Sequence, residues 1–349
     1  MLSKVYFKPV APHAPVEIIQ RTARELLACV IEREAVKLSA KAALKVHFGE
    51  KGNVTYIPAE SYTGMIHYLK EKGVECCFME TSVLYGGMRF NRERHTQLAL
   101  EHGFTQIPVV IADGAEGEEF TEIPIHGKHF EKCRIGKAFA EYDQMIVLSH
   151  FKGHRLAGFG GAIKQLSMGC ASKGGKLDMH LGINPKIIDR KCKRCHLCQT
   201  RCHSNAITIG SRSFIDDSKC VGCGACYSVC PHKAVSVMTV RGILKALLTL
   251  RAFPERLAEY ALAAQKGKRN IYLNFALNIT KHCDCESTPQ KAFLPDIGVF
   301  ASTDPVAIDE ACYEAVKRLG KKFRGHAQIS YAEKIGLGSR EYELVTLPD

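Results

Sequence analysis

Short apolar stretches alternate with longer amphipathic stretches in the first part of the chain. Runs rich in β-branched residues predict strands, and apolar residues at helical spacing predict helices. The predicted strands are residues 45–48, 74–79, 108–112 and 145–148. The predicted helices are residues 61–72, 92–102 and 137–141, with a hairpin near His126 and Gly127.

The same alternation returns near the C-terminus. It predicts a helix at 254–265, strands at 271–276 and 299–301, and a helix at 305–319. Strands and helices in alternation are typical of an α/β fold with a largely parallel sheet flanked by helices. We therefore expect residues 1–187 and 240–349 to form one discontinuous α/β domain, interrupted by a small α+β module at 188–239.

The interrupting segment contains two copies of one cysteine pattern. Each copy has three cysteines at every third position and a fourth one after three more residues. The first copy is Cys192, Cys195, Cys198 and Cys202, and the second is Cys220, Cys223, Cys226 and Cys230, followed by Pro231. Position 192 corresponds to position 220, so the spacing indicates an internal duplication with a 28-residue offset.

This spacing is typical of two 4Fe–4S clusters. Three closely spaced thiolates bind three irons of one cluster, and the fourth cysteine of each run binds the other cluster. One predicted cluster takes Cys192, Cys195, Cys198 and Cys230, and the other takes Cys220, Cys223, Cys226 and Cys202. Structural zinc is the alternative, but zinc sites use cysteine pairs a dozen or more residues apart. The segment is therefore predicted to be a two-cluster, bacterial-ferredoxin-type module for electron transport.

The two cysteine runs differ in their small residues. The second loop contains Gly222 and Gly224, where the first has Arg194 and His196. His203 stands where such a run usually has proline. The ligand set is complete in both, and the basic first loop is expected to shift the potential of its cluster.

The composition is that of an ordinary globular protein, with 349 residues, 46% hydrophobic and 24% charged. The N-terminus lacks the pattern of an export signal, and the apolar stretch 243–250 is too short to span a bilayer. A cytoplasmic protein without a membrane segment is expected. Sixteen cysteines in a reducing compartment favour metal or cluster binding over disulfides.

The net charge is +12, and basic residues are spread along the whole chain. No alternation of basic and aromatic residues is present, which argues against nucleic acid as a partner. Between positions 189 and 237, eight Lys and Arg stand against three Asp. This excess predicts an acidic electron donor such as a ferredoxin or a reductase, with a solvated basic face as the alternative. A small anionic substrate is also consistent with the charge.

Ligands of such sheets bind beyond the carboxyl ends of the strands. The predicted strand ends, which are rich in Gly, His, Lys and Cys, lie at 47–53, 80–87, 112–114, 149–165, 278–287 and 301–305. In an extended segment, His150, Lys152 and His154 share one side and are candidate catalytic residues. Cys283 and Cys285, with His180, are candidate ligands of an additional metal ion, and spare reduced thiols are the alternative. The glycine-rich stretch 158–176 is a candidate for binding an anion at a helix N-terminus.

The chain resembles the family known as domain of unknown function 362, in the subgroup with an inserted 4Fe–4S ferredoxin domain. The resemblance covers nearly the whole chain. It is carried by KVHFGEKGN, the long block from His150 to His180, KHCDCES, GVFASTDPVAIDEAC and YAEKIGLGSREYELV. It implies an iron–sulfur protein of anaerobic or facultative microbes, and it implies no defined reaction.

Two functions follow from these observations. In the first, an oxidoreductase delivers electrons from the clusters to a substrate or metal at the ends of the strands. In the second, a non-catalytic carrier, redox sensor or assembly partner uses the clusters to relay electrons.

Overall fold

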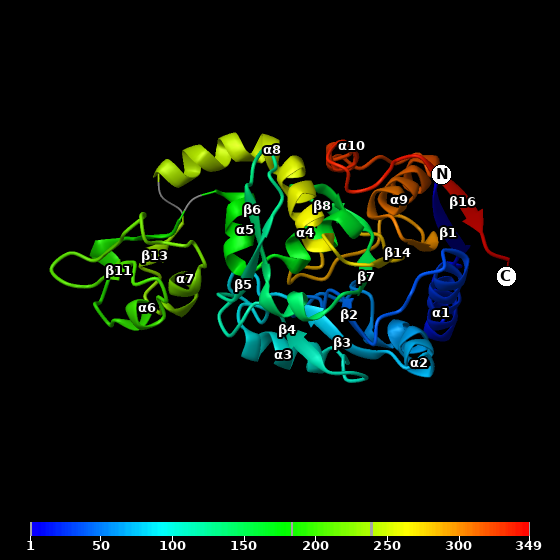
Figure 1. The fold of residues 1–349 in the computed structure, drawn as a ribbon, viewed down its shortest axis with the longest axis horizontal. Helices are drawn as coiled ribbons and strands as arrows, with labels where there is room; N and C mark the ends of the chain where they lie inside the picture. Colours follow the sequence, from blue (N-terminus) through cyan, green and yellow to red (C-terminus); the bar gives the residue numbers. More distant parts are fainter. Residues whose placement is uncertain (1, 183, 238–239, 349) are drawn as a thin grey trace.

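An eight-stranded sheet forms the centre of the computed structural model, which describes residues 2–182, 184–237 and 240–348 (Figure 1). From one edge to the other, the strands are β16 (Tyr342–Thr346), β1 (Ser3–Pro9), β15 (Gly298–Ser302), β14 (Ile271–Ala276), β7 (Met145–His150), β2 (Lys41–Lys45), β3 (Glu75–Glu80) and β4 (Val109–Ile111). Adjacent strands run parallel except at β15, which is antiparallel to both β1 and β14. The expected α/β fold with a largely parallel sheet is confirmed.

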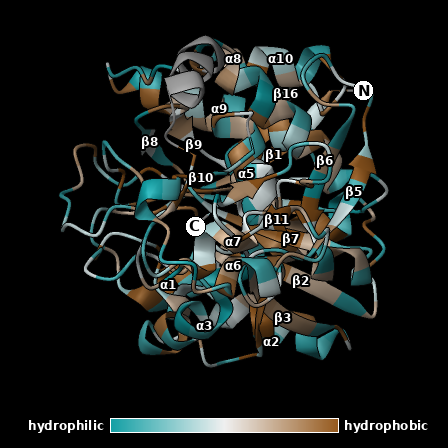
Figure 2. Ribbon diagram, turned by 90° about the vertical axis from the view of Figure 1, so that its left-hand side faces the viewer, coloured by the Kyte–Doolittle hydropathy of each residue, from teal (hydrophilic) through white to brown (hydrophobic). Residues whose placement is uncertain are grey.

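The central strands are buried on both faces because helices cover both sides of the sheet. All six residues of β7 and all six of β14 are buried. On one face lie α1 (Val16–Arg33), η1 (Ala59–Tyr62), α2 (Thr63–Glu71) and α3 (Arg92–Glu101). On the other lie α4 (Ala162–Cys170), α5 (Lys173–His180), α8 (Val240–Gln265), α9 (Pro305–Arg318) and α10 (Ala327–Lys334). Each face has its own hydrophobic core, and Figure 2 shows the apolar residues gathered on β7, β2 and β3.

Two sequence predictions gave wrong element bounds. The strand expected at 45–48 is β2, which ends at Lys45, so that His47 lies beyond the sheet edge. The helix expected at 254–265 begins at Val240, because α8 continues through Pro254. Proline removes one helical hydrogen bond and bends the axis, and Figure 1 shows α8 as a bent helix. The terminal elements β1, α1, α10 and β16 were not predicted.

Two hairpins and a short 3₁₀ helix complete the α/β part. The expected hairpin is formed by β5 (Phe120–Pro124) and β6 (Lys132–Gly136), and η2 covers Lys137–Glu141. A second hairpin, β8 (Lys152–His154) with β9 (Gly158–Gly160), follows β7 directly. None of the described helices is both long enough and apolar enough to cross a membrane.

The cysteine-rich segment has a small hydrophobic core of its own and protrudes at the end of the molecule opposite the two termini (Figure 1). Its elements are η3 (Asp189–Lys191), α6 (Leu197–Thr200), β11 (Ile207–Thr208), β12 (Phe214–Ile215) and α7 (Ala225–Val229). Where the chain enters and leaves it, β10 (Lys186–Ile187) pairs antiparallel with β13 (Val235–Ser236). The expected division of the chain into domains stays a prediction, and its boundary at 239 lies outside the described residues.

Candidate functional site

The two cysteine quartets each surround a cavity. Cys192, Cys195, Cys198 and Cys230 line one, and Cys202, Cys220, Cys223 and Cys226 line the other. Each cavity has a volume of about 320 Å³, including the part open to solvent. Among the described residues, no three thiols of either quartet converge to within 4.8 Å of one another, as the ligands of a single ion would. The cysteines are therefore grouped and spaced in a way that fits two clusters better than two zinc ions.

The duplication extends to the backbone. Arg194 and His196 have φ of 53° and 61°, and the equivalent Gly222 and Gly224 have 64° and 82°. The first loop therefore adopts the left-handed conformation without glycine, which costs backbone energy that its partners must offset. Arg194 has such partners, since its guanidinium donates to the carbonyls of Gly210 and Ser211.

Backbone N–H groups point at equivalent sulfurs in the two halves. The N–H groups of Arg194 and Gly222 donate to the sulfurs of Cys192 and Cys220, each at 3.4 Å. The N–H groups that follow the fourth cysteines, of Ala206 and Ala234, donate to Cys202 and Cys230 at 3.3 Å. Such hydrogen bonds stabilise thiolate ligands and tune a cluster potential. These N–H donors therefore also fit a 4Fe–4S cluster in each quartet.

The loop of the second quartet packs directly against α5. A Cβ added at Gly174 would lie 2.6 Å from the Gly222 carbonyl oxygen and 3.1 Å from Cys223 Cα, so only glycine allows this approach. Lys173 strengthens the contact, because its ammonium donates to Ser228 Oγ at 2.5 Å and to the Phe90 carbonyl at 2.7 Å. The module is thus joined to the α/β part at the helix that also lines the main cavity.

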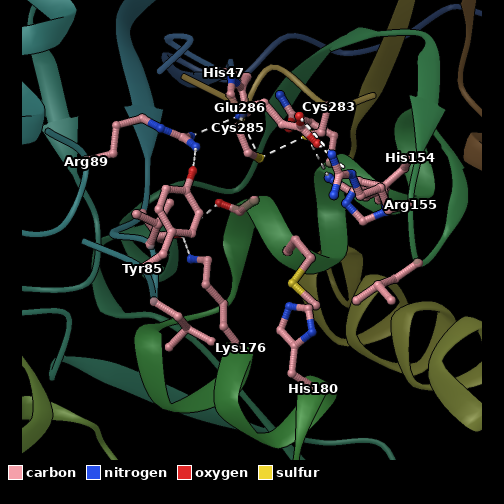
Figure 3. Close-up of a pocket in the computed structure, with 18 of the residues that line it drawn as sticks. His47, Tyr85, Arg89, His154, Arg155, Lys176, His180, Cys283, Cys285 and Glu286 are labelled. Atoms are coloured by element: carbon pink, nitrogen blue, oxygen red, sulfur yellow. Dashed lines mark hydrogen bonds and ion pairs between the residues drawn. The ribbon is translucent and has the colours of Figure 1, made fainter. Parts of the chain in front are cut away.

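That main cavity lies at the carboxyl ends of β2, β3 and β14 and has a volume of about 1040 Å³, including the part open to solvent (Figure 3). Its walls come from loops after these strands, from the β8–β9 hairpin, and from α4, α5 and α8. The polar side chains that line it are His47, Glu80, Thr81, Tyr85, Arg89, His154, Arg155, Lys164, Gln165, Lys176, His180, Cys283, Cys285 and Glu286. The crevice expected at the strand ends is therefore present.

Two thiols and one imidazole meet on one wall of this cavity. Cys283 and Cys285 have sulfurs 2.8 Å apart, and His47 Nε2 lies 3.6 Å from the Cys285 sulfur. A hydrogen bond from the Cys283 thiol holds the pKa of Cys285 well below that of an ordinary cysteine, and His47 and Arg89 act in the same direction. The pKa of Cys283 is raised well above normal by its bond to Cys285 and by burial. Of the two thiols, Cys285 has the surroundings that favour the thiolate form.

Asp284 anchors this cysteine loop from behind. Its carboxylate is fully buried and accepts hydrogen bonds from His150 Nδ1 at 3.0 Å and pairs with Lys152 Nζ at 2.7 Å. Burial alone would raise the pKa of Asp284, but His150 and Lys152 outweigh it and hold the pKa below its usual range. Three residues were expected to be catalytic. Two of them, His150 and Lys152, contact Asp284 instead of lining the cavity, and through Asp284 they position the cysteine loop.

The other sequence candidates line the cavity itself. His154 stands at the end of β8, and His180 at the end of α5. Burial lowers the pKa of both, that of His180 to about 4, so both rings are neutral at pH 7. His180 lies across the cavity from the cysteines in Figure 3 and is not part of the group that converges on them. His47 takes the position among the thiols that His180 was expected to fill.

A network of buried ion pairs forms the floor of the site. Lys45 Nζ lies 2.9 Å from Glu80, and Arg89 lies 3.4 Å from Glu50 and 3.7 Å from Glu80. Arg89 is almost fully buried and also bonds to His47 Nε2 at 2.9 Å and to the Tyr85 hydroxyl. The carboxylates of this network are therefore already paired with cations.

Two lysines on the cavity wall make no ion pair with a carboxylate in the described part of the chain. Lys176 is 6% exposed and donates only to Thr81 Oγ1 at 2.5 Å and to the Ala171 carbonyl at 2.7 Å. Burial lowers its pKa to about 8. Lys164 is half-buried and its ammonium lies 3.7 Å from the Cys283 sulfur. A buried ammonium without a carboxylate is an unfavourable arrangement that a bound anion relieves.

The glycine-rich stretch before α4 already holds an anion from the protein itself. The N–H groups of Ala162 and Ile163, at the start of α4, donate to the Asp309 carboxylate at 2.7 and 3.0 Å. The anion-binding helix end expected in 158–176 is therefore occupied by an internal carboxylate, and Lys164 instead faces the cavity.

Sequence reasoning named only part of this site. His47 and Glu80 were included in the reactive strand ends but not as individual residues. Arg89 lies just beyond the end of the range 80–87, and Lys176 lay within a glycine-rich stretch. One signal for Lys176 was available in the sequence. His180 follows it by four residues in a helical stretch, so that both side chains lie on the same face of the helix.

The model of the family described as Domain of unknown function (DUF362) matches residues 42–314. No curated protein matches the chain. A crystal structure of a protein from Thermotoga maritima, a Northeast Structural Genomics Consortium target, is 13% identical with a TM-score of 0.39, covering 93% of this chain and 60% of that one. The lactate racemase apoprotein from Thermoanaerobacterium thermosaccharolyticum is 12% identical with a TM-score of 0.36, covering 79% and 51%. The chain spans three fifths and about half of these two proteins.

Proposed function

The chain belongs to the DUF362 family, whose description assigns no reaction, and we propose that it is an iron–sulfur oxidoreductase acting on a small anion in the main cavity. Cys192, Cys195, Cys198 and Cys230 would hold one 4Fe–4S cluster, and Cys220, Cys223, Cys226 and Cys202 the other. When bound, the clusters supply electrons one at a time.

One observation supports this proposal above the others. The loop of the second quartet lies on α5 with no side chain between them at Gly174, and the same helix carries Lys176 and His180 into the cavity. A single short helix therefore separates cluster ligands from the cavity wall. An electron carrier without a reaction of its own has no need of such a connection.

The module has a solvent side and an inner side. Cys195 of the first quartet is exposed, and so are the neighbouring Lys193, Arg194 and Arg201. The second quartet is the one that packs on α5. An acidic donor such as a ferredoxin or a reductase is therefore proposed to dock on the basic side, next to the first quartet.

The side chains of the cavity suit the reduction of an anion. Lys164 and Lys176 would hold its negative group, because both ammonium groups face the cavity without a carboxylate partner among the described residues. With a pKa of about 8, the Lys176 ammonium is also able to release a proton from Nζ to a substrate atom on which negative charge builds up. Arg155 pairs with Glu286 at 2.9 Å beside the opening of the cavity.

The proposal is tested with the full chain reconstituted anaerobically with iron and sulfide. Reduced methyl viologen serves as the donor, and a panel of small carboxylates and oxoanions as acceptors. We expect about eight irons per chain and viologen oxidation with a member of the panel. The oxidation should disappear in Lys176→Met and in Gly174→Val. Gly210→Val is the matched control, because nothing lies within 4 Å of a Cβ at Gly210.

Two results would count against it. Absence of iron after reconstitution would exclude the clusters. If Lys176→Met and His154→Gln pass electrons to a protein acceptor as fast as the parent chain, while no small anion is reduced by any form, the protein is a carrier or a redox-sensing partner.

A further inference from the structure

We infer that His47, Cys283 and Cys285 form a binding site for one thiophilic divalent metal ion, of the Zn²⁺ or Fe²⁺ class, with a free coordination position facing the main cavity. This site is separate from the two cysteine quartets. The inference goes beyond the proposed electron transfer and does not depend on it.

The convergence of the three donor atoms is the first argument. His47 Nε2 and the sulfurs of Cys283 and Cys285 all lie within 4.8 Å of one another. In the part of the chain that the structure describes, no other set of three His, Cys, Asp or Glu donors converges in this way. Two thiolates and one imidazole are a typical ligand set for a thiophilic ion.

The three residues are also held in place by contacts with the rest of the fold. The loop between the cysteines is fixed by Asp284, whose backbone carbonyl also accepts the Glu50 N–H at 3.0 Å. The Cys283 carbonyl accepts hydrogen bonds from Gln290 Nε2 and from the Glu286 N–H at 3.0 and 3.1 Å. The His47 ring is held at both nitrogens, by the Gly49 N–H at Nδ1 and by the Arg89 guanidinium at Nε2, and Nε2 lies 3.6 Å from the Cys285 sulfur. To bind an ion, Nε2 exchanges its contact with Arg89 for a bond to the metal. Ligands supported in this way lose little conformational freedom when an ion binds.

Only a small adjustment converts this arrangement to a coordination geometry. The sulfurs of Cys283 and Cys285 lie 2.8 Å apart. With metal–sulfur bonds of ~2.3 Å in a tetrahedral site, they would lie ~3.8 Å apart. Rotation of the Cys285 side chain, which is half-buried at the cavity wall, supplies the difference of about 1 Å.

The position of the donors predicts what the ion would bind. All three ligands line the cavity, so the fourth coordination position opens into it. Two thiolates neutralise a divalent ion, which leaves the charges of Lys164 and Lys176 uncompensated in the same space. A small carboxylate or oxoanion bound to the ion would compensate them. The site therefore selects an anion that places one oxygen on the metal and another near a lysine.

Zinc alone is the probe, because it is redox-inert and its X-ray absorption edge is separate from that of iron. The reconstituted full chain is incubated anaerobically with one equivalent of Zn²⁺ and passed through a desalting column, and zinc, iron and sulfide are measured. We expect about one zinc per chain, and absorption fine structure with sulfur at ~2.3 Å and nitrogen at ~2.0 Å. In Cys283→Ser/Cys285→Ser, zinc falls at least fivefold while iron and sulfide stay at the parent level.

The matched control is Cys29→Ser/Cys76→Ser, which removes two half-buried thiols elsewhere and is expected to keep both zinc and iron. His47→Gln should lower the zinc content with the iron unchanged. The inference is overturned if zinc is retained by the 283/285 double variant, or if the parent chain takes up none. It is also overturned if the anaerobic parent chain carries a 283–285 disulfide, a mass loss of about 2 Da. Because iron is measured in each sample, failure of this site is distinguished from failure of the clusters.

Discussion

The module at 188–239 and the main cavity both rely on cysteine, but they bring their cysteines together in different ways. In the module, eight cysteines come from two short runs, and each half repeats the φ angles and N–H donors of the other. In the cavity, Cys283 and Cys285 meet a histidine that lies more than 200 residues away in the chain. The first arrangement follows from local spacing, and the second requires the whole sheet.

The surroundings of the two groups differ as well. The first quartet reaches the surface at Cys195, among exposed basic residues. The cavity thiols stand above buried ion pairs, beside lysines that have no carboxylate partner among the described residues. An exposed basic surface suits exchange of electrons with a protein, and an enclosed polar cavity suits a small molecule. The comparison separates where electrons would enter from where they would be used.

The substitution with the largest expected effect removes a cluster ligand from the module and leaves the cavity unchanged. Cys226→Ala removes one ligand of the second quartet, and we expect iron to fall from about eight to about four per chain. Zinc uptake by the cavity should not change. Iron and zinc analysis of the reconstituted protein measures both, with Cys29→Ala as control. Loss of zinc together with iron would show that the two sites do not form independently.

The next substitution removes an ion pair from the floor of the cavity and leaves the module unchanged. Lys45→Met leaves the Glu80 carboxylate buried without its nearest cation. Removal of one partner of a buried pair costs about 3–5 kcal/mol, and Lys45→Met/Glu80→Gln should recover most of it. Urea unfolding followed by circular dichroism gives the free energies, and iron content should stay at the parent level. A change below about 1 kcal/mol would mean that the pair contributes little.

A smaller effect on zinc affinity is expected from Asp284, which holds the loop between the two cysteines. Asp284→Asn weakens the hold of His150 and Lys152 on the loop while the ligands themselves remain. Residues that orient metal ligands are typically worth 10- to 100-fold in metal affinity, so zinc affinity should fall by about that factor. A competition titration with a chelating dye measures it. Asp296→Asn, which lies on the same loop segment without contacting Asp284, should bind zinc like the parent chain.

The smallest predicted effect is a pH dependence confined to the cavity. Lys176 has a pKa lowered to about 8, so its ammonium is charged below pH 8 and loses its charge above it. Affinity for a bound carboxylate should therefore fall by up to roughly tenfold between pH 7 and pH 9. Lys176→Arg keeps the charge and should remove this step in the pH profile. Calorimetric titration at the two pH values tests it, and an equal loss in the arginine variant would contradict the assignment.

The fold class could be predicted from the sequence because the central strands are buried at every position and are mostly apolar, as in β7 and β14. The grouping of the cysteines was also readable, since their spacing is a local property. The partners of Cys283 and Cys285 were not readable in this way. His47 follows the end of β2, and only the order of strands in the sheet brings it beside the thiols.

The same limit explains the roles of His150 and Lys152. Their alternation suggested side chains that act on a ligand, but Asp284, more than 130 residues later, binds both. A lone aspartate between two cysteines shows nothing about the direction of its side chain. Pro254 illustrates a local error: proline is favoured at the first turn of a helix, yet α8 passes through it.

The pairing of β10 with β13 has a practical consequence. The chain leaves the α/β part and returns to it through two strands that are hydrogen-bonded to each other, at Ile187 with Val235. The two ends of the intervening segment are therefore about one strand spacing apart, roughly 5 Å. A two-residue turn spans that gap. Excision of the segment should yield a shortened chain that keeps the cavity and its lysines, a binding protein without redox centres in which ligand affinity is measured in the absence of absorbing iron.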